Sequence, residues 1–526
     1  MTAAAIPYEP VAPDRYRFKY IIAITVSLAS VLELLDTSIV NVAIPHMMGN
    51  LGATLDQIAW VSTGYIVANV IVLPITGWLS AYFGRRRYFA GSIALFTIAS
   101  FMCGNAGSLG ALVFWRIVQG LGGGALLSTS QAILYEEFPR EEYGTAMAIF
   151  GVGVMVGPTL GPTVGGWITD MYGWPWIFYI NIPFGMLALA LTLSFITDSR
   201  HQERSQRVDF IGLGLLAIGV GSLQTMLERG ERLDWLASGE VRFLAIASAV
   251  ALISFIWHEL RTEHPVVDLR ILKSRQLAVG VVYGLVLGVC LYATVFVLPV
   301  YLQNVRHFTA NQTGLVILPG ALASAFTMAF MGRLQGKFDA RLSIAAGVAI
   351  FAYSMWKHAH FTTESGFHDF FWPLIYRGVG LGLIFVPLTN LALADLPMSK
   401  IPNGTGLFNL MRQLGGSVGI ALSATLLQRF TAIHRADLAA SVTPYAEATR
   451  ERVAMITQAL VARGELPAIA QTKAIGFLNG IVTREAMMLS FEQLFLLFGA
   501  AFVLSLPLLL LMHRSKALPS GAAAAH

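Results

Sequence analysis

Two carboxylates stand three residues apart inside an apolar stretch near the start of the chain. Glu33 and Asp36 lie in LELLDTSIVNVAIP, which continues an apolar run that begins near Tyr20. An ionised carboxylate in hydrocarbon costs about 2.5–3.5 kcal/mol even on a lenient insertion scale. Burial and a like-charged neighbour both favour the neutral form of a carboxyl group. Such a group can take up a proton on one side and release it on the other, so both acids are predicted to couple protons.

An arginine within another apolar stretch is a natural partner for these acids. Arg116 lies a turn or two into the stretch that contains FWRIVQGLGGG. An arginine that pairs with a deprotonated acid and is released on protonation acts as a switch, so Arg116 is predicted to share in the coupling. A purely structural acid–arginine pair is the alternative. Arg377 and Arg412, in later apolar stretches, fit a structural role equally well.

The composition defines the setting in which these charges must be held. Of the 526 residues, 56% are hydrophobic and only 12% are charged, about half the charged fraction of a soluble protein. The apolar residues form blocks of roughly 18–25, long enough to cross a bilayer as helices. The chain is therefore predicted to be an all-α polytopic membrane protein. Its net charge of +5 does not indicate nucleic-acid binding, because the basic residues lie between the blocks.

Fourteen blocks can be counted. They lie near 20–42, 57–80, 88–106, 110–133, 143–167, 174–197, 209–228, 240–260, 277–302, 311–332, 342–361, 371–395, 404–428 and 489–512. Loops such as GRRRY and GRLQGKFDAR are rich in Lys and Arg, whereas the first three loops on the opposite side contain neither. The positive-inside rule therefore predicts that both termini are cytoplasmic, which an even number of spans satisfies.

An internal repeat suggests how the blocks are grouped. GWLSAYFGRR at Gly77 and GRLQGKFDAR at Gly332 share the pattern G-x-L-x-x-x-F-x-x-R, and Arg116 and Arg377 follow them at similar distances. Many secondary transporters consist of two such halves with a site between them near the midplane. We expect two six-helix bundles and two inserted helices. The predicted units are an N-terminal bundle at 1–197, an inserted segment with cytoplasmic linkers at 198–276, and a C-terminal bundle at 277–526.

The C-terminal unit contains one segment that is not membrane-like. Residues 431–488 are mixed in charge, and Val453, Ile456 and Leu460 recur within them at helical spacing. By the span count this loop faces outward. A solvated helical hairpin and a docking surface for another protein are the two interpretations.

Two segments have the composition of a hinge or a gate, one rich in glycine and proline and the other rich in arginine. GVGVMVGPTLGPTVGGW at 151–167 has glycines every four residues, which favour close helix packing, and prolines that favour bends. The GRRR cluster at 84–87 is a topology anchor, and its ion pairs could also hold the cytoplasmic side shut. The residues predicted to serve as gate or hinge are Gly77, Gly84, Arg85, Arg86, Gly157, Pro158, Gly161 and Pro162.

These motifs together resemble those of the major facilitator superfamily. They are LDTSIVNVAIP, the loop that ends in GRRR, RIVQG and GPTLGPTVGGW. Fourteen spans and the Gly-Pro-rich fifth helix resemble its drug:proton antiporter branch, and the chain is most similar to EmrB-type exporters of Gram-negative bacteria. Two features depart from the family pattern. Ala81 stands where the loop motif usually has Asp, and Glu33 is not a motif residue.

The resemblance implies proton-driven export of hydrophobic toxic compounds (drugs, uncouplers or fatty acids) across the bacterial inner membrane by alternating access. It also implies two partners, a periplasmic adaptor protein and an outer-membrane channel. No cofactor is expected, because the proton gradient supplies the energy. Neither an enzyme nor a metal site is expected, since the chain shows no catalytic triad pattern, metal-ligand spacing or nucleotide-binding loop.

The spans rich in Met and Phe imply a large apolar cavity for lipophilic molecules. Its candidate lining residues are Asn41, Tyr65, Asn69, Gln131, Tyr292, Asn390, Asn409 and Gln413. Two other functions stay open on the sequence alone. One is a proton-coupled importer of a small molecule, and the other is a membrane sensor or scaffold that transports nothing.

Overall fold

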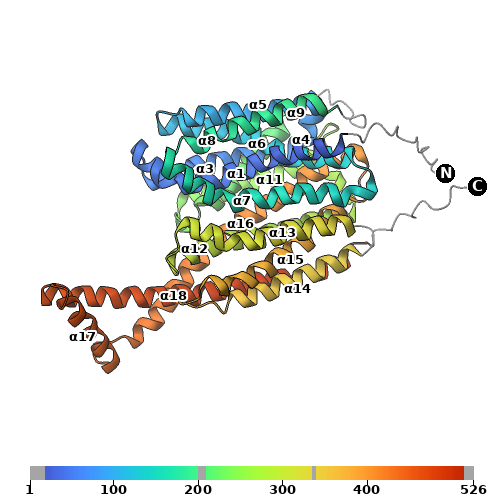
Figure 1. Cartoon of the computed structure of the whole chain (residues 1–526). Helices are drawn as coiled ribbons and strands as arrows, with labels where there is room; N and C mark the ends of the chain where they lie inside the picture. The colour runs from blue at the N-terminus through green and yellow to red at the C-terminus, as the bar shows by residue number, and fades with distance from the viewer. Residues whose placement is uncertain (1–17, 199–208, 335–338, 514–526) are drawn as a thin grey trace, which may run out of the picture.

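The computed structural model describes residues 18–198, 209–334 and 339–513. Regular structure in these ranges is helical (Figure 1). The first part contains α1 (Lys19–Leu51), α2 (Leu55–Ile58), α3 (Trp60–Val72), η2 (Leu73–Ile75), α4 (Thr76–Phe83), α5 (Arg85–Gly104), α6 (Leu109–Glu137), η3 (Arg140–Glu142), α7 (Tyr143–Tyr172), α8 (Trp176–Tyr179) and α9 (Asn181–Phe195). These helices form the N-terminal half.

The inserted segment and the C-terminal half follow. The inserted segment contains α10 (Phe210–Arg229), η4 (Trp235–Ala237), α11 (Gly239–Arg261) and η5 (Leu269–Lys273). The C-terminal half contains α12 (Arg275–Asn304), α13 (Ala310–Leu334), α14 (Ala340–His358), α15 (Phe367–Leu393), η6 (Met398–Lys400), α16 (Ile401–Ser441), α17 (Glu447–Val461), α18 (Pro467–Leu504) and α19 (Pro507–Leu510).

Every one of the fourteen predicted blocks coincides with helix. Within the described ranges, twelve helices are long and apolar enough to cross a membrane. The remaining two blocks correspond to α7 and α14, which have 30 and 19 residues. The prediction of an all-α polytopic membrane protein is confirmed.

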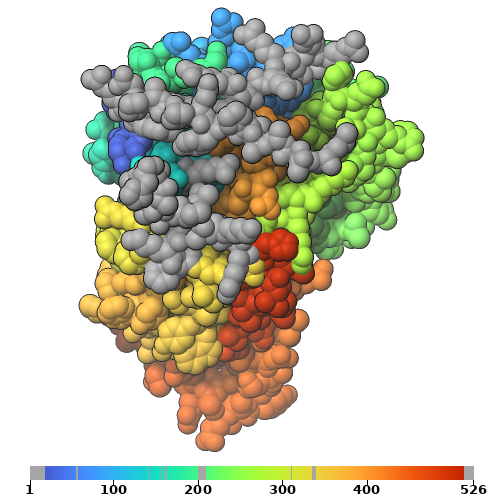
Figure 2. Space-filling model, turned by 90° about the vertical axis from the view of Figure 1, so that its right-hand side faces the viewer, coloured from blue at the N-terminus to red at the C-terminus, as the bar shows by residue number. Residues whose placement is uncertain are grey.

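The two halves meet on two sides. On one side α7 packs along α13, and on the other α16 packs against η2, α4 and α6. α10 packs on α11 and contacts both α3 and α16, so the inserted pair spans the second junction. Figure 2 shows the molecule turned by 90° from Figure 1, with the inserted pair (light green) along one flank of the two halves.

The glycine-rich segment of α7 lies against α1. A Cβ added at Gly157 would stand 2.9 Å from the Cβ of Leu34, and one added at Gly161 would stand 2.5 Å from the Cβ of Ser38. Side chains at these glycines would therefore force α1 away. Pro162 lies in the same helix, and its side chain is outside the described part of the structure.

Two helices of the C-terminal half extend far beyond the bundle. α16 has 41 residues and α18 has 38. They project beyond the other helices at one end of the bundle (left in Figure 1) and carry α17 at their tip. α17 has no buried residue. The block predicted at 404–428 marks only the apolar part of α16, because helical hydrogen bonding continues after the composition becomes polar.

Candidate functional site

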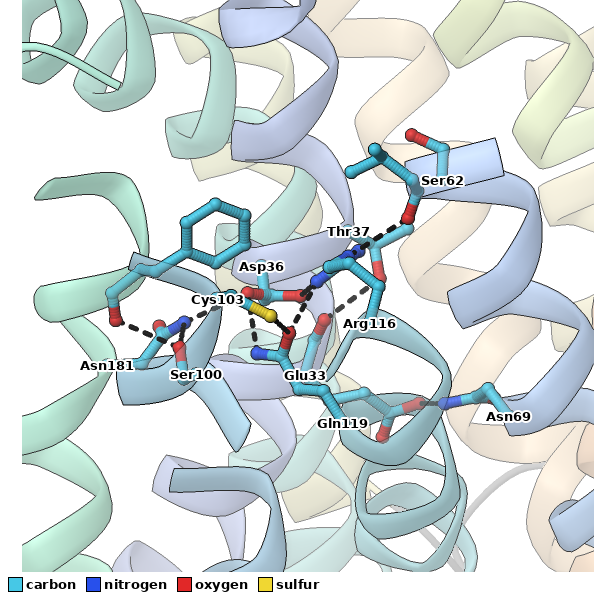
Figure 3. Close-up of polar contacts among 12 residues, drawn as sticks. Glu33, Asp36, Thr37, Ser62, Asn69, Ser100, Cys103, Arg116, Gln119 and Asn181 are labelled. Atoms are coloured by element: carbon cyan, nitrogen blue, oxygen red, sulfur yellow. Dashed lines mark hydrogen bonds and ion pairs between the residues drawn. The ribbon is translucent and has the colours of Figure 1, made fainter. Parts of the chain in front are cut away.

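The side chain of Asp36 is fully buried in the N-terminal half, and both of its oxygens have partners (Figure 3). Its Oδ2 accepts a 2.5 Å hydrogen bond from Arg116 Nη1. Its Oδ1 accepts hydrogen bonds from Gln119 Nε2 at 3.0 Å and Asn181 Nδ2 at 2.9 Å. These donors come from α6 and α9, so the predicted acid–arginine pair forms within one half.

Arg116 is held by more than its acid. Its Nε donates to the carbonyl oxygen of Val61 at 3.0 Å, and Nη1 also donates to Gln119 Oε1 at 2.7 Å. The guanidinium carbon lies 4.2 Å from the centre of the Tyr65 ring. A cation over an aromatic face is stabilised further. Arg116 and Gln119 reach the same carboxylate because residues three apart share a helix face.

A second layer of polar groups fixes the amide donors. Asn181 Nδ2 also donates to Ser100 Oγ at 3.0 Å, and that hydroxyl donates to the Phe178 carbonyl oxygen at 2.9 Å. Cys103 Sγ lies 3.7 Å from Gln119 Oε1. Sequence reasoning did not assign Asn181 to the site. Its signal is a lone amide side chain in the otherwise apolar segment WIFYINIPFG.

Glu33 occupies a different environment on the same helix, although it too is buried, with 2% of its side chain exposed. Its Oε1 accepts a 2.9 Å hydrogen bond from Asn69 Nδ2, whereas Oε2 has no hydrogen-bond partner among the described residues. The Asn69 amide oxygen in turn accepts a 3.4 Å hydrogen bond from Gln413 Nε2. Glu33 is therefore linked to the other half.

Five of the eight predicted lining residues make polar contacts between the halves. Besides Asn69 and Gln413, Asn409 Nδ2 donates to Gln131 Oε1 at 2.7 Å, and the Tyr135 hydroxyl donates to Asn390 Oδ1 at 2.7 Å. These contacts join α3 and α6 to α15 and α16. The sequence-predicted polar residues therefore gather at the boundary between the bundles.

The other three lining candidates lie apart from these contacts. Tyr65 packs under Arg116, and its hydroxyl has no hydrogen-bond partner in the described ranges. Tyr292 lies against Gly416 and lines a cavity between the halves. Asn41 is exposed, and its Oδ1 accepts a 3.1 Å hydrogen bond from Ser62 Oγ.

The predicted gate arginines bind acceptors within the N-terminal half. Arg85 is 2% exposed and forms ion pairs with Glu136 and Glu137 at the end of α6. Its Nη2 also donates to the Thr197 carbonyl oxygen at 3.0 Å. The backbone N–H of Arg86 donates to Asp198 Oδ1 at 2.9 Å, so the segment after α9 is tied to the start of α5.

Two of the predicted gate residues are glycines at positions where a side chain would be strained or would clash. Gly84 has φ +87°, a conformation that favours glycine. Gly77 faces the side chain and backbone of Asn403 on α16 so closely that a Cβ would overlap them. Pro158 lines the same cavity as Tyr292.

The geometry can be compared with that of known proteins. The Major Facilitator Superfamily model matches residues 26–420. The chain is 34% identical to "Fatty acid resistance protein FarB" of Neisseria gonorrhoeae over 488 residues, covering 93% of this chain and 94% of that protein. It is also 34% identical to "Multidrug export protein EmrB" of Escherichia coli strain K12 over 489 residues, with the same coverage.

A more distant relative and a solved structure agree with these matches. "Colistin resistance protein EmrB" of Acinetobacter baumannii is 29% identical over 486 residues, covering 92% of this chain and 94% of that protein. The crystal structure of the human organic anion transporter MFSD10 superposes with a TM-score of 0.60 at 13% identity, covering 93% of this chain and 99% of that chain. At that identity the likeness shows the fold alone.

Proposed function

Because the chain belongs to the major facilitator superfamily and resembles its EmrB-like multidrug efflux pumps, we propose that it is a proton-coupled antiporter. It exports hydrophobic toxic compounds across the bacterial inner membrane by alternating access. The observation that carries this proposal is the buried Asp36–Arg116 pair, with the incompletely paired Glu33 three residues away. Burying two acids in a membrane bundle is energetically costly, and ionisable residues inside membranes usually have a function.

Protonation of Asp36 removes the charge that holds Arg116. Leaving one member of a buried ion pair without its partner costs about 3–5 kcal/mol. That is enough to shift a two-state equilibrium by two orders of magnitude or more. Proton binding at Asp36 therefore favours another arrangement of α1 and α6, in which Arg116 finds a different partner. Glu33 transmits its own change of charge to the C-terminal half through Asn69 and Gln413.

The names of the relatives support the proposed substrates, and the extended helices support the proposed partners. The names of the relatives refer to fatty acids, multiple drugs and colistin, which supports lipophilic compounds as cargo. We place both termini in the cytoplasm, so that α17 faces the periplasm. There the extended α16 and α18 would meet a periplasmic adaptor protein that leads to an outer-membrane channel. The proton gradient drives the cycle without a cofactor.

The test is transport by the purified chain in proteoliposomes. With an imposed pH gradient, the wild type should move a fluorescent lipophilic drug against the direction of proton flow, and adding drug should move protons. Asp36→Asn should lose both movements and retain its size-exclusion profile. Asp437→Asn, which removes an exposed acid on the extension of α16, is the matched control and should behave as the wild type.

Three outcomes would contradict the proposal. Full transport by Asp36→Asn would remove that acid from the mechanism. Drug and protons moving in the same direction would indicate the importer. An intact protein that moves neither would indicate a sensor or scaffold.

A further inference from the structure

A cavity lies at the junction where α7 of the N-terminal half meets α12, α13 and α15 of the C-terminal half. Its walls are mainly aliphatic and aromatic, and they include Met155, Leu291, Tyr292 and Leu381. A pocket of this kind, apolar with a few placed polar groups, is the usual form of a small-molecule site.

One side chain in the lining of this cavity carries a charge, that of Arg377 on α15. The residue is 93% buried, at 7% exposure. Among the described residues its guanidinium has neither an ion-pair nor a hydrogen-bond partner. An uncompensated cation is costly inside a membrane protein, and such residues mark substrate and ion pathways.

The internal repeat makes the lack of a partner informative. Arg377 is the counterpart of Arg116, which has Asp36, Gln119 and the Val61 carbonyl as acceptors. The C-terminal half has an arginine at the equivalent position, and none of its described acids forms an ion pair with that arginine. The charge of Arg116 is therefore neutralised by Asp36, whereas the charge of Arg377 is available to an anionic ligand.

The backbone around Arg377 holds it in place. Gly378 approaches the carbonyl oxygen of Gly320 so closely that a Cβ would overlap it, and a Cβ at Gly320 would lie 2.7 Å from the Leu374 carbonyl oxygen. α13 and α15 are thus in backbone contact at the level of the cavity. The cation stands on a rigid helix pair, as a binding residue must if its geometry is to be pre-organised.

We propose that Arg377 binds the anionic headgroup of amphipathic substrates, while the apolar walls receive the hydrophobic body. The ligand class is a lipophilic molecule with one carboxylate or phenolate, because guanidinium forms charge-assisted, paired hydrogen bonds with such groups. This inference rests on the proposed export function and names a substrate class for it. An anionic phospholipid headgroup has the same chemistry and is the second source to be tested.

The experiment compares charged and uncharged forms of one probe. Binding of laurate and of methyl laurate to the full-length protein is measured in phosphatidylcholine vesicles for the wild type, Arg377→Gln and Arg377→Lys. Arg429→Gln, which removes an exposed charge from the same half, is the control. We expect Arg377→Gln to weaken laurate binding about tenfold to a hundredfold and to leave the ester unchanged. Arg377→Lys should retain part of the affinity.

Each alternative result has a separate meaning. Unchanged laurate binding in Arg377→Gln overturns the inference, and so does an equal loss for laurate and ester, because that indicates altered packing. Phosphatidylglycerol that competes with laurate in the wild type but not in Arg377→Gln supports the site and assigns it to lipid headgroups as well.

Transport separates this inference from the proposed function. Export of an uncharged drug should persist in Arg377→Gln while laurate export falls. If the wild type exports neither compound, the proposed function fails. If the variant exports both compounds as the wild type does, only the role of Arg377 fails.

Discussion

Asp36 and Arg116 form an ion pair in which the two side chains are 0% and 1% exposed, and their further hydrogen-bond partners in the described ranges lie in the same half of the protein. Glu33, one helical turn away, differs because Asn69, the one described side chain that bonds its carboxylate, is itself bonded to Gln413 of the other half. The two acids therefore differ in which half their partners occupy. Under the proposed mechanism, Asp36 would set the internal state of the N-terminal bundle, and Glu33 would respond to the contact between the bundles.

Replacing Arg116 tests the energy stored in the pair. Arg116→Met leaves Asp36 buried without its cation and should lower the free energy of unfolding by about 3–5 kcal/mol. Adding Asp36→Asn to this variant should restore part of the loss, because no buried charge then remains. Denaturant unfolding of the purified protein measures the stability of Arg116→Met, of Asp36→Asn and of the double variant. Strictly additive losses would contradict a direct coupling of the two side chains.

Glu33→Gln tests the second acid. The amide oxygen can still accept the hydrogen bond from Asn69, and Oε2 loses no partner among the described residues, so stability should change by less than about 1 kcal/mol. Fewer protons should be released per drug molecule bound, as measured with a pH indicator in weakly buffered detergent solution. Glu451→Gln on the exposed α17 is the control. Proton release equal to that of the wild type would assign coupling to Asp36 alone.

The contact between α1 and α7 predicts contrasting effects at two glycines. Gly161→Ala places a methyl group 2.5 Å from the Cβ of Ser38, whereas Gly166→Ala meets only Val42, at 3.7 Å. Overpacking of this kind costs about 1–3 kcal/mol. We expect a lower melting temperature and slower transport for Gly161→Ala and neither change for Gly166→Ala. Equal behaviour of the two variants would refute the packing role.

The hydrogen bond from Tyr135 to Asn390 predicts a shift between conformations. Tyr135→Phe removes a bond between the halves worth about 1 kcal/mol, so the population with the halves joined at this point should fall about fivefold relative to its alternative. Spin-label distances between α6 and α15 would report the change. Trp235→Phe, which removes a 2.9 Å hydrogen bond from the inserted segment to Thr425 of α16, should leave those distances as they are.

The exposed α17 predicts that folding and assembly can be separated. Because no residue of α17 is buried, replacing residues 442–466 with a short flexible linker should preserve the melting temperature and transport in proteoliposomes. In cells, cross-linking to the periplasmic adaptor and drug resistance should both fall. Full resistance in cells that express the shortened protein would show that the tip makes no necessary contact.

Much of the fold could be predicted because the bilayer constrains sequence strongly. Each apolar block corresponds to a helix, since backbone groups in hydrocarbon must be satisfied within the segment. The lengths of α16 and α18 could not be predicted in the same way. Hydropathy marks where a helix leaves hydrocarbon, and the helix itself continues as long as its hydrogen bonding does. The residues after 428 include Arg429, Arg435 and Asp437 and no longer form an apolar block, yet α16 continues to Ser441.

The candidate site could be predicted only in part from the sequence. Asp36 and Arg116 are conspicuous because buried charge is expensive, and the structure brings them together. Asn181 was missed because a neutral amide in an apolar helix carries little cost and so little signal. The difference between Arg116 and Arg377 was also invisible, because the repeat gives them equivalent positions and only packing shows which one has an acid beside it.

The uninterrupted course of α16 has a mechanical consequence. A helix of 41 residues is about 60 Å long, at about 1.5 Å per residue. One part of it packs against η2, α4 and α6, and its far end carries the tip beyond the bundle. A small tilt of the packed part of α16 would therefore displace its far end by a larger distance. In the proposed efflux system, this helix would act as a lever arm that transmits the state of the bundle to a partner outside the membrane.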